Sequence, residues 1–395
     1  MLLRRCRHLL IEPRETRSVD LEALLRGEAR QLSCRTWIAL ASHLDAEVEL
    51  DTEEVTALGG LSSEAVEARE VLEERWGAAV IAGLLQKGLL LQASPLEPAS
   101  PAERADQSQR NTHWRGLAAV MHRHLRWRGV DSEEARASGA LGDRGEDVVQ
   151  RLGPPPPVSR MRTDETTLLP LPSRSTNGAA DLAGRATCRN FNPKQHLPLD
   201  LFAQMLQTVY GAQGQSVVSG VPVLKKNSPS AGGLHPVEAY LLVQHVEGVA
   251  PGLYHYRPDT HALEPLKALT PGEAREHASL FVARQPWFVD AHVQVILAAR
   301  FQRNFWKYRN HAKAYRAVIL DAGHLSQMQY LAATELGLGA FITAAINEGD
   351  IEDAFGLDPM QEGVLAVTGF GWRGERMEVL EFDPLKQVWP DWSPE

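Results

Sequence analysis

A proline-rich stretch in the middle of the chain sets the strongest limit on how this protein can fold. Gly153 is followed by four consecutive prolines, and Pro170 and Pro172 continue the pattern. Proline restricts its own φ angle and has no N–H to donate, so such a stretch forms a stiff extended connector. With 395 residues, the chain has room for two unequal domains. We therefore predict a domain boundary at this stretch.

The composition is that of a globular protein with an acidic balance. Hydrophobic residues make up 44%, which is enough for a sizeable core. The formal net charge of -9 argues against nucleic-acid binding, because non-specific binding needs a basic surface to neutralise phosphates. No stretch of the sequence reads as a signal peptide or is apolar enough to span a bilayer. We expect a cytoplasmic protein without membrane contact.

Cysteines and histidines do not form a metal-binding pattern. Three cysteines occur at wide spacing: Cys6, Cys34 and Cys188. An odd count at this spacing fits neither a disulfide framework nor a zinc site, which needs closely spaced pairs. His122 and His124 are two positions apart, so they would face different directions on a helix. We expect reduced thiols and no metal site.

Residues 1–93 are predicted to form a small helical domain. Apolar residues recur at helical spacing in Leu21–Leu25 and Cys34–Leu44, and a helix over Val80–Leu85 is followed by the strand-like Gly88–Leu91. This succession resembles a winged-helix unit, a fold that binds DNA or peptides. The helices are rich in glutamate, which makes DNA the poorer partner.

Residues 94–172 are expected to connect the two domains. Ser94–Gln109 is rich in proline, serine, alanine and charge, which is typical of a linker. One helix is expected at about 114–127, and the proline-rich connector follows it.

Residues 173–395 mix helical and strand patterns without a regular strand–helix–strand repeat, which predicts an α+β fold. The expected elements are helices at 198–210 and 314–336 and strands at 237–246, 293–299, 340–346 and 364–368. The second helix is apolar almost all round, so it should be buried in a core or in a dimer interface.

Two motifs in this part could bind a ligand. Arg185, Thr187 and Arg189 alternate along an extended segment, so their side chains can converge on an anion such as a phosphate. The segment Ser228–Pro236 contains two adjacent glycines, which allow the backbone to approach a planar ligand and expose N–H donors to it. Alone, the arginine motif fits an ordinary surface strand better, and the glycine motif fits an ordinary loop equally well.

Together with Lys307-Tyr308 and Gly337-Leu338-Gly339, these motifs resemble the nitroreductase superfamily of flavin enzymes. The resemblance covers about residues 177–373 and is strongest to the SagB-like branch, the azoline dehydrogenases of peptide maturation. It implies a mixed sheet flanked by helices and bound FMN. It also implies a homodimer with the flavin sites at the subunit interface.

The resemblance also implies which residues touch FMN. They are Arg185, Thr187, Arg189, Ser230, Ala231, Gly232, Gly233, Gly337, Leu338, Gly339, Thr343, Ala344, Ala345 and Arg373. Thr187 stands where the family more often has serine, a difference that keeps the hydroxyl.

Lys307 and Tyr308 are the implied catalytic residues. Dehydrogenation removes a hydride and a proton from neighbouring carbons, and a desolvated lysine or a tyrosine beside a cation can take the proton. The resemblance implies a ribosomally made precursor peptide as substrate, a cyclodehydratase as possible partner, and oxygen as the reoxidant.

Two other functions stay open. One is an NAD(P)H-dependent nitro or quinone reductase, although no G-x-G-x-x-G motif follows a strand. The other is a flavin-free scaffold protein of a peptide-modification complex.

Overall fold

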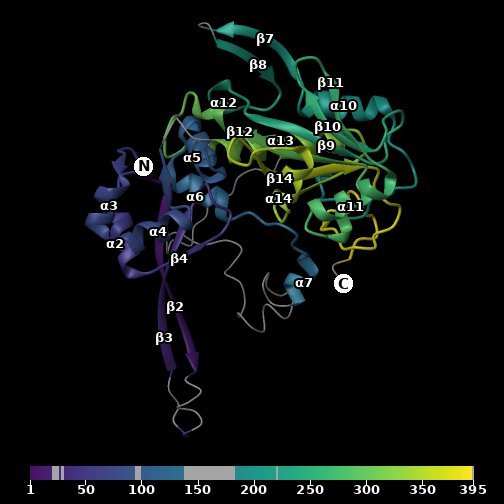
Figure 1. Ribbon diagram of the computed structural model, residues 1–395. Helices are drawn as coiled ribbons and strands as arrows, with labels where there is room; N and C mark the ends of the chain where they lie inside the picture. The colour runs from purple at the N-terminus through teal and green to yellow at the C-terminus, as the bar shows by residue number, and fades with distance from the viewer. Residues whose placement is uncertain (20–25, 28–30, 94–98, 138–182, 219–220, 394–395) are drawn as a thin grey trace, which may run out of the picture. The chain divides into compact units, whose positions relative to one another are not determined.

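Figure 1 shows the computed structural model of the chain, which describes residues 1–19, 26–27, 31–93, 99–137, 183–218 and 221–393. The chain divides into two compact units, each discontinuous in sequence. Unit 1 comprises Met1–Arg126, Ala299–Ile319 and Gly356–Gly363, and unit 2 comprises Trp127–Ala298, Leu320–Phe355 and Val364–Glu395. The domain boundaries after residues 93 and 172 stay a prediction. The proline-rich connector and Leu21–Leu25 lie outside the described residues.

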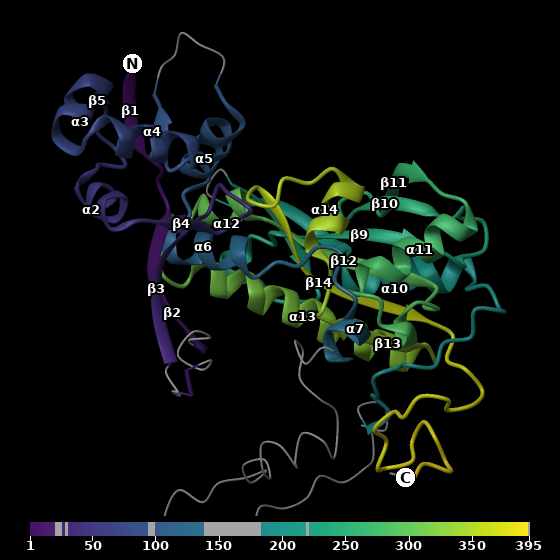
Figure 2. The same ribbon diagram turned by 60° about the horizontal axis from the view of Figure 1, so that its bottom comes forward.

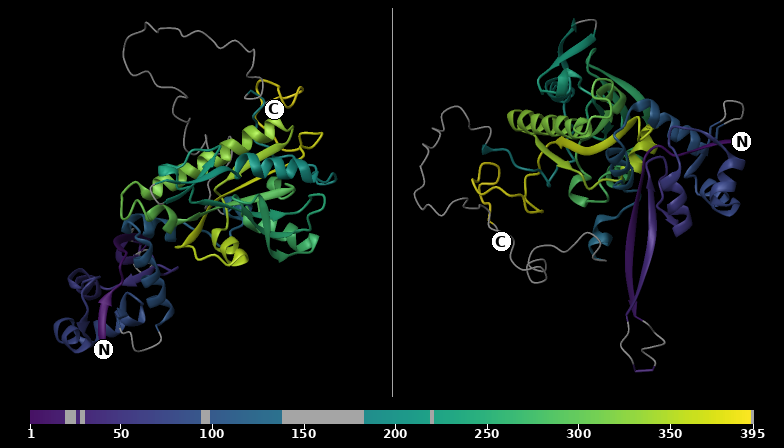
Figure 3. Two further views of the ribbon diagram at one scale, coloured as in Figure 1. Left: turned by 90° about the horizontal axis from the view of Figure 1, so that it is seen from above. Right: turned by 90° about the vertical axis from the view of Figure 1, so that its left-hand side faces the viewer.

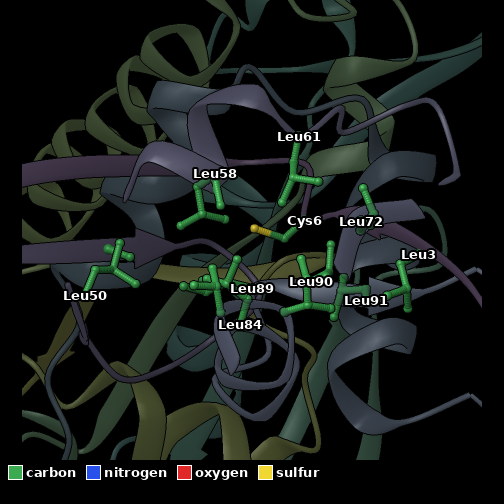
Figure 4. Packing of buried hydrophobic residues seen from close by; sticks show 14 of the residues in the cluster. Leu3, Cys6, Leu50, Leu58, Leu61, Leu72, Leu84, Leu89, Leu90 and Leu91 are labelled. Carbon is green, nitrogen blue, oxygen red and sulfur yellow. The ribbon is translucent and has the colours of Figure 1, made fainter. Parts of the chain in front are cut away.

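Three short helices and a small sheet build the N-terminal part of unit 1. The helices are α2 (Thr52–Gly60), α3 (Arg69–Trp76) and α4 (Ala78–Gln86). The sheet has the order β5-β1-β6 and consists of β1 (Leu2–Arg5), β5 (Glu67–Ala68) and β6 (Leu90–Gln92). Figure 4 shows their shared core, in which the buried Cys6 lies among leucine side chains. The step from the last helix into a strand is confirmed, whereas the winged-helix assignment stays a prediction.

A long antiparallel hairpin includes most of the segment Cys34–Leu44, for which the sequence predicts a helix. Strands β2 (Leu9–Val19) and β3 (Gln31–Ala41) pair along their whole length, and β4 (Val48–Leu50) pairs with the end of β3 (Figure 1). The helical assignment of Cys34–Leu44 is therefore wrong. A short apolar run fits either a helix or a strand, and pairing with β2 decides between them. Ile38 and Leu40 pack with Val120, while alternate residues of β3 join the core of Figure 4.

Residues 101–112, which the sequence assigns to a linker, form a helix. It is α5 (Pro101–Thr112), and α6 (Gly116–His124) follows within the predicted range 114–127. The Ser100 hydroxyl accepts the Glu103 N–H at 3.2 Å, and the Glu103 carboxylate accepts the Ser100 N–H at 2.7 Å. Pro101 occupies the first turn, where no N–H is needed. The proline and serine that suggest a linker are thus the start signal of α5.

An aromatic cluster in unit 1 joins these helices to the later segment Phe301–Tyr315, which begins with α12 (Phe301–Phe305). The ring centroid of Trp114 lies 4.5 Å from that of Phe301 and 4.8 Å from that of Phe305. The indole N–H of Trp114 donates to the Met360 carbonyl at 3.0 Å. The connection between the predicted domains therefore supports the chain segment that carries Lys307 and Tyr308.

His122 belongs to this cluster as a neutral imidazole. Its Nδ1 lies 2.8 Å from the Tyr315 hydroxyl and its Nε2 lies 2.9 Å from the Pro359 carbonyl oxygen. A neutral ring with the proton on Nε2 satisfies both partners, whereas a charged ring would place a second N–H against the hydroxyl. Burial lowers the pKa of His122 to about 3, and the nearby Arg126 adds to the effect.

We expect His122 to make unit 1 sensitive to acid. Below a pH of about 6.5, the unfolded chain binds a proton at this residue that the folded protein excludes. The free energy of unfolding should therefore fall by about 2–3 kcal/mol between pH 7 and pH ~4.5 from this residue alone. His122→Gln should remove that part of the slope, and His324→Gln, at an exposed position, should leave it unchanged. Urea unfolding followed by tryptophan fluorescence at both pH values measures it, and identical slopes in all three proteins would contradict the prediction.

Unit 2 is built around a six-stranded sheet with the order β11-β10-β9-β12-β14-β13. Its strands are β9 (Val237–Val243), β10 (Gly252–Arg257), β11 (Ala262–Ala268), β12 (Val293–Arg300), β13 (Gly339–Thr343) and β14 (Glu362–Gly371). A separate hairpin pairs β7 (Ala212–Val218) with β8 (Val221–Lys226). Strand β9 is buried along its whole length, as expected of a strand covered on both faces. The strands predicted near residues 237, 293, 340 and 364 are confirmed.

Helices cover both faces of this sheet. The helices of this unit are α7 (Ser132–Ala137), α10 (Leu199–Val209), α11 (Pro271–Phe281), α13 (Ala314–Glu335) and α14 (Glu348–Phe355), with the short 3₁₀ turns η1 (Ala231–Gly233) and η2 (Pro286–Phe288). Helices α10 and α13 lie on one face, and α11 and α14 lie on the other (Figure 2, Figure 3). Phe202 of α10 stacks on Phe370 of β14, and Phe281 of α11 contacts Phe355 of α14. The predicted α+β class is confirmed.

Helix α13 confirms the predicted long helix but is not buried on every side. Val318, Ala322 and Leu325 are buried, whereas Ile319 is 46% exposed and Leu320 is 57% exposed. Within the described ranges, two apolar side chains of the helix are therefore left exposed. Neither α13 nor any other helix in the described ranges has the combination of length and hydrophobicity needed to cross a bilayer.

Candidate active site

The segment from Arg185 to Phe191 runs along the edge of the sheet in unit 2. Thr187 forms a parallel bridge with Ala340 of β13, and the Cys188 N–H donates to the Ala340 carbonyl at 2.8 Å. The alternate residues Ala186, Cys188 and Asn190 are buried, while Arg185, Thr187 and Arg189 are only half-buried. The extended backbone therefore turns the three predicted ligand-binding side chains away from the core, as alternation predicts.

Tyr330 of α13 brings Arg185 and Thr187 together. The guanidinium carbon of Arg185 lies 5.3 Å from the centre of the Tyr330 ring, within cation–π range. The Tyr330 hydroxyl lies 3.0 Å from the Thr187 hydroxyl oxygen. Within the described ranges, Arg185 has no carboxylate partner. Its guanidinium N–H donors and the Thr187 hydroxyl can therefore serve an anionic ligand.

The loop Ser228–Pro236 is held by Asp321 of α13. The Ser230 hydroxyl donates to Oδ2 of Asp321 at 2.5 Å, and the Ala231 N–H donates to Oδ1 at 3.2 Å. The same Ser230 oxygen accepts the His235 N–H at 2.9 Å. The polar groups of Ser230 and Ala231, which we expected to serve the cofactor, are therefore engaged within the protein.

Gly232 and Gly233 give this loop its exposed backbone. Their φ angles are 64° and 68°, in the left-handed region that glycine adopts without strain. A Cβ on Gly233 would meet nothing within 4 Å, so the backbone angle and not crowding requires glycine there. Gly232 is exposed, and in the described part of the chain its N–H has no acceptor. The loop therefore presents an N–H donor on exposed backbone, which a planar ligand can approach.

Folding alone accounts for the three residues at the step from α13 into β13. Gly337 has a φ of 70° and its N–H donates to the Thr334 carbonyl at 3.2 Å, as in a helix C-cap. A Cβ on Gly339 would lie 2.5 Å from the Cys188 sulfur, so the neighbouring segment requires glycine there. Leu338 is buried. The cofactor role of these residues stays a prediction.

The end of β13 is held by Gln285, a residue that no sequence motif includes. Its Nε2 donates to the Thr343 hydroxyl oxygen at 3.2 Å and to the Ala345 carbonyl at 2.9 Å. The Ala345 N–H also donates to the Thr343 hydroxyl oxygen at 3.2 Å. Of the three predicted residues here, only Ala344 has an exposed side chain.

Arg373 is paired with Glu381, which is completely buried. The Glu381 carboxylate also accepts the N–H of Arg189 at 2.6 Å, the N–H of Asn190 at 3.0 Å and the indole N–H of Trp389 at 2.8 Å. Arg373 therefore neutralises an internal charge. Binding of the FMN phosphate by Arg373 stays a prediction. The carboxylate of Glu381 competes with a phosphate for the Arg373 guanidinium.

Arg189 lines a cavity of about 720 Å³ in unit 2. Phe191 and Trp287 contribute aromatic surface to it, and Lys194 and Glu375 contribute charges of both signs. The volume is in the range of small-molecule sites.

Lys307 and Tyr308 lie in unit 1, on the loop between α12 and α13. The Asn304 carbonyl accepts the N–H of Lys307 at 3.2 Å and the N–H of Tyr308 at 3.1 Å. The Asn304 side chain donates to the Ala314 carbonyl at 3.0 Å and so closes the loop. The Lys307 ammonium lies 5.5 Å from the centre of the Tyr308 ring. Lys307 is exposed and Tyr308 is half-buried, so the described residues do not supply the expected desolvation of Lys307.

Helix α13 separates the predicted residues of unit 2 into two groups. Tyr330 holds Arg185 and Thr187, whereas Asp321 holds Ser230 and Ala231. Tyr330 and Asp321 are nine positions apart on α13, about two and a half turns at 3.6 residues per turn, so they point to opposite sides. A small ligand on one side of the helix therefore meets only one of the groups from a given chain.

Comparison with known proteins identifies one family and related processing proteins. The sequence profile described as Nitroreductase family matches residues 182–372. The trifolitoxin-processing protein TfxB of Rhizobium leguminosarum bv. trifolii is 30% identical over 220 residues, which cover 53% of this chain and 56% of TfxB. The microcin B17-processing protein McbC of Escherichia coli is 25% identical over 186 residues, which cover 46% of this chain and 65% of McbC. This chain thus spans between half and two thirds of the length of these relatives.

One solved structure is similar over much of the chain. It is a chain of the Escherichia coli microcin synthetase McbBCD complex with truncated pro-MccB17 bound. The TM-score is 0.53 at 18% identity, and the match covers 71% of this chain and 100% of that chain. At this identity the likeness establishes the fold alone, and the fold expected from the sequence motifs is confirmed.

Proposed function

Residues 182–372 of this chain belong to the nitroreductase family, and from this premise we propose that the protein is an FMN-dependent dehydrogenase of peptide maturation. The proposed reaction is the oxidation of azoline rings to azoles in a ribosomally made peptide. The names of TfxB and McbC as processing proteins of trifolitoxin and microcin B17 support a peptide substrate. The alternatives are an NAD(P)H-dependent nitro or quinone reductase and a flavin-free scaffold.

The single observation that carries this proposal is the donor set at Tyr330, within the matched domain. Arg185 and Thr187 meet there on the side of their segment that faces away from the core, and Arg185 has no carboxylate partner in the described ranges. A guanidinium and a hydroxyl so placed suit the phosphate of FMN. The exposed Gly232 N–H would donate to the flavin ring. Bound FMN would supply the two-electron acceptor.

The chain itself must supply the base for this reaction. Oxidation of an azoline breaks two C–H bonds on neighbouring ring carbons, with one hydrogen leaving as hydride and the other as a proton. Lys307 or Tyr308 would take the proton, and the choice between them stays open. Their loop is closed by Asn304, so the two side chains are presented from a defined backbone.

We further propose a homodimer. The Tyr330 group and the Asp321 group lie on opposite sides of α13, so a second copy would be needed to bring one of each to the same FMN. The exposed Ile319 and Leu320 on α13 support a partner on this helix, since burial of apolar side chains away from water lowers the free energy.

The N-terminal part of unit 1 would bind the precursor peptide or a cyclodehydratase.

Anaerobic mixing with peptide tests the proposed reaction. We expect the FMN-loaded protein to lose its oxidised-flavin absorbance when an azoline-containing peptide is added, at least ~10-fold faster than with NADPH. The product peptide should lose two hydrogens per ring by mass spectrometry. The same peptide before cyclisation is the control and should leave the flavin oxidised. Faster bleaching by NADPH would favour the nitro or quinone reductase, and failure to take up FMN would favour the scaffold.

A further inference from the structure

The carboxylate of Asp321 has a position in unit 2 that none of the sequence motifs explains. It projects from α13, is 5% exposed, and makes its hydrogen bonds to the loop Ser228–Pro236. We propose that Asp321 is a positioning residue, which holds this loop in the shape that presents the Gly232 N–H to the flavin. The loop shape is a property of the chain alone, whereas its use for flavin rests on the proposed function.

The hydrogen bonds tie the loop at both of its ends. Asp321 accepts the Ser230 hydroxyl at 2.5 Å and the Ala231 N–H at 3.2 Å, which fixes the start of the turn. Because the Ser230 hydroxyl donates to Asp321, its oxygen is oriented to accept the His235 N–H at 2.9 Å. One carboxylate therefore orders both the entry into the glycines and the exit from them.

The loop needs such a support because of its backbone angles. Gly232, Gly233 and His235 have φ angles of 64°, 68° and 46°. The glycines adopt this region freely but lose more chain entropy on ordering than other residues do, and His235 is strained there. A loop with these angles would populate other shapes if the hydrogen bonds from Asp321 were absent.

A carboxylate at position 321 carries a desolvation cost, because its surroundings are buried. Burial raises the pKa of Asp321, and the hydrogen bond from Ser230 opposes that shift. Lys226, which is 5% exposed, and His235 line the same small cavity, and His324 lies one turn further along α13. An apolar residue would fill this space without the desolvation cost, so retention of a carboxylate points to its acceptor function.

Hydrogen exchange tests the loop shape without any cofactor. In the flavin-free protein, Asp321→Ala should speed amide exchange of Ala231 and His235 by at least ~10-fold. Asp321→Asn should do so less, since its Oδ1 can still accept the Ala231 N–H and its amide can donate to the Ser230 oxygen. Glu335→Ala, an exposed acidic residue of the same helix, is the control and should leave both rates unchanged. Unchanged rates in Asp321→Ala would overturn the proposal.

FMN titration tests the purpose of the loop. We expect Asp321→Ala to raise the Kd for FMN by about 10-fold, with Asp321→Asn within ~3-fold of the unchanged protein and Glu335→Ala equal to it. Faster exchange with unchanged FMN affinity would overturn the positioning role. If the protein without substitutions takes up no FMN, the proposed function fails. The amide exchange rates then still test whether Asp321 fixes the conformation of the loop.

A third variant covers the case in which Asp321→Ala does not fold. Ser230→Ala keeps the carboxylate and its bond to Ala231 but removes the acceptor of the His235 N–H. Exchange at His235 should then rise by about 10-fold while Ala231 stays protected. If Ser230→Ala left the exchange rates of both Ala231 and His235 unchanged, the proposed link from Asp321 through Ser230 to His235 would be wrong.

Discussion

Replacing Lys307 by alanine should lower peptide oxidation by about 10²–10⁴-fold while FMN stays bound, the range that a positioned general base contributes. The two backbone bonds to the Asn304 carbonyl and the closure of the loop by the Asn304 side chain do not involve the Lys307 side chain. The variant should therefore keep its fold. Single-turnover mixing with an azoline peptide measures the effect, because it separates chemistry from product release.

Tyr308→Phe decides which member of the pair is the base. The substitution removes only the hydroxyl, and the ring over which the Lys307 ammonium lies is retained. A loss in Tyr308→Phe as large as that in Lys307→Ala would mean that the pair acts as one unit. A much smaller loss would assign the proton to Lys307.

Lys313→Ala is the matched control for both variants. Lys313 is an exposed lysine on the same loop and should leave turnover unchanged. Full turnover in both Lys307→Ala and Tyr308→Phe, with FMN retained, would show that the base lies elsewhere.

Replacing Glu381 by alanine should lower the free energy of unfolding by about 3–5 kcal/mol, the cost of removing one partner from a buried ion pair. The carboxylate is completely buried and accepts bonds from Arg373, Arg189, Asn190 and Trp389. Its loss leaves the Arg373 charge without its buried partner and several N–H donors without an acceptor. Urea unfolding with circular dichroism measures this change.

Glu378→Ala is the control for Glu381. Glu378 is exposed, and its bond to Asn190 uses the backbone N–H, which alanine keeps. Its stability should stay within about 0.5 kcal/mol of the unchanged protein. Equal stability of the two variants would show that the C-terminal segment is not anchored through Glu381.

The same segment shows why sequence pattern can mislead. Leu380, Glu381, Phe382 and Asp383 alternate as a strand with an apolar inner face would, yet Leu380 is 52% exposed and Phe382 is 73% exposed. The acidic side chains point inwards because they have partners there. Glu381 pairs with Arg373, and Asp383 accepts the N–H groups of Val388 and Trp389. Whether a carboxylate is buried depends on donors brought from elsewhere in the chain.

Local chemistry was sufficient to predict part of the local geometry of the candidate site. The alternation of Arg185, Thr187 and Arg189 and the glycines at 232 and 233 behave as the sequence predicts, since both depend on neighbouring residues only. Tyr330, Gln285 and Glu381 could not be predicted, because each acts through side chains or backbone distant in sequence. Asp321 left a signal, as an acidic residue between apolar neighbours on a long apolar helix.

The sequence by itself determined the α+β class, the long helix α13 and the motifs of the candidate site. These features depend on hydrophobic periodicity and backbone preferences, which residues close together in the sequence define. Only the tertiary structure decided that residues 31–41 are a strand and that α5 and α6 support the Lys307 loop. It also separated the two groups of site residues on α13. Pairing and packing join residues far apart in the chain, and the free energy of those contacts overrides local preference.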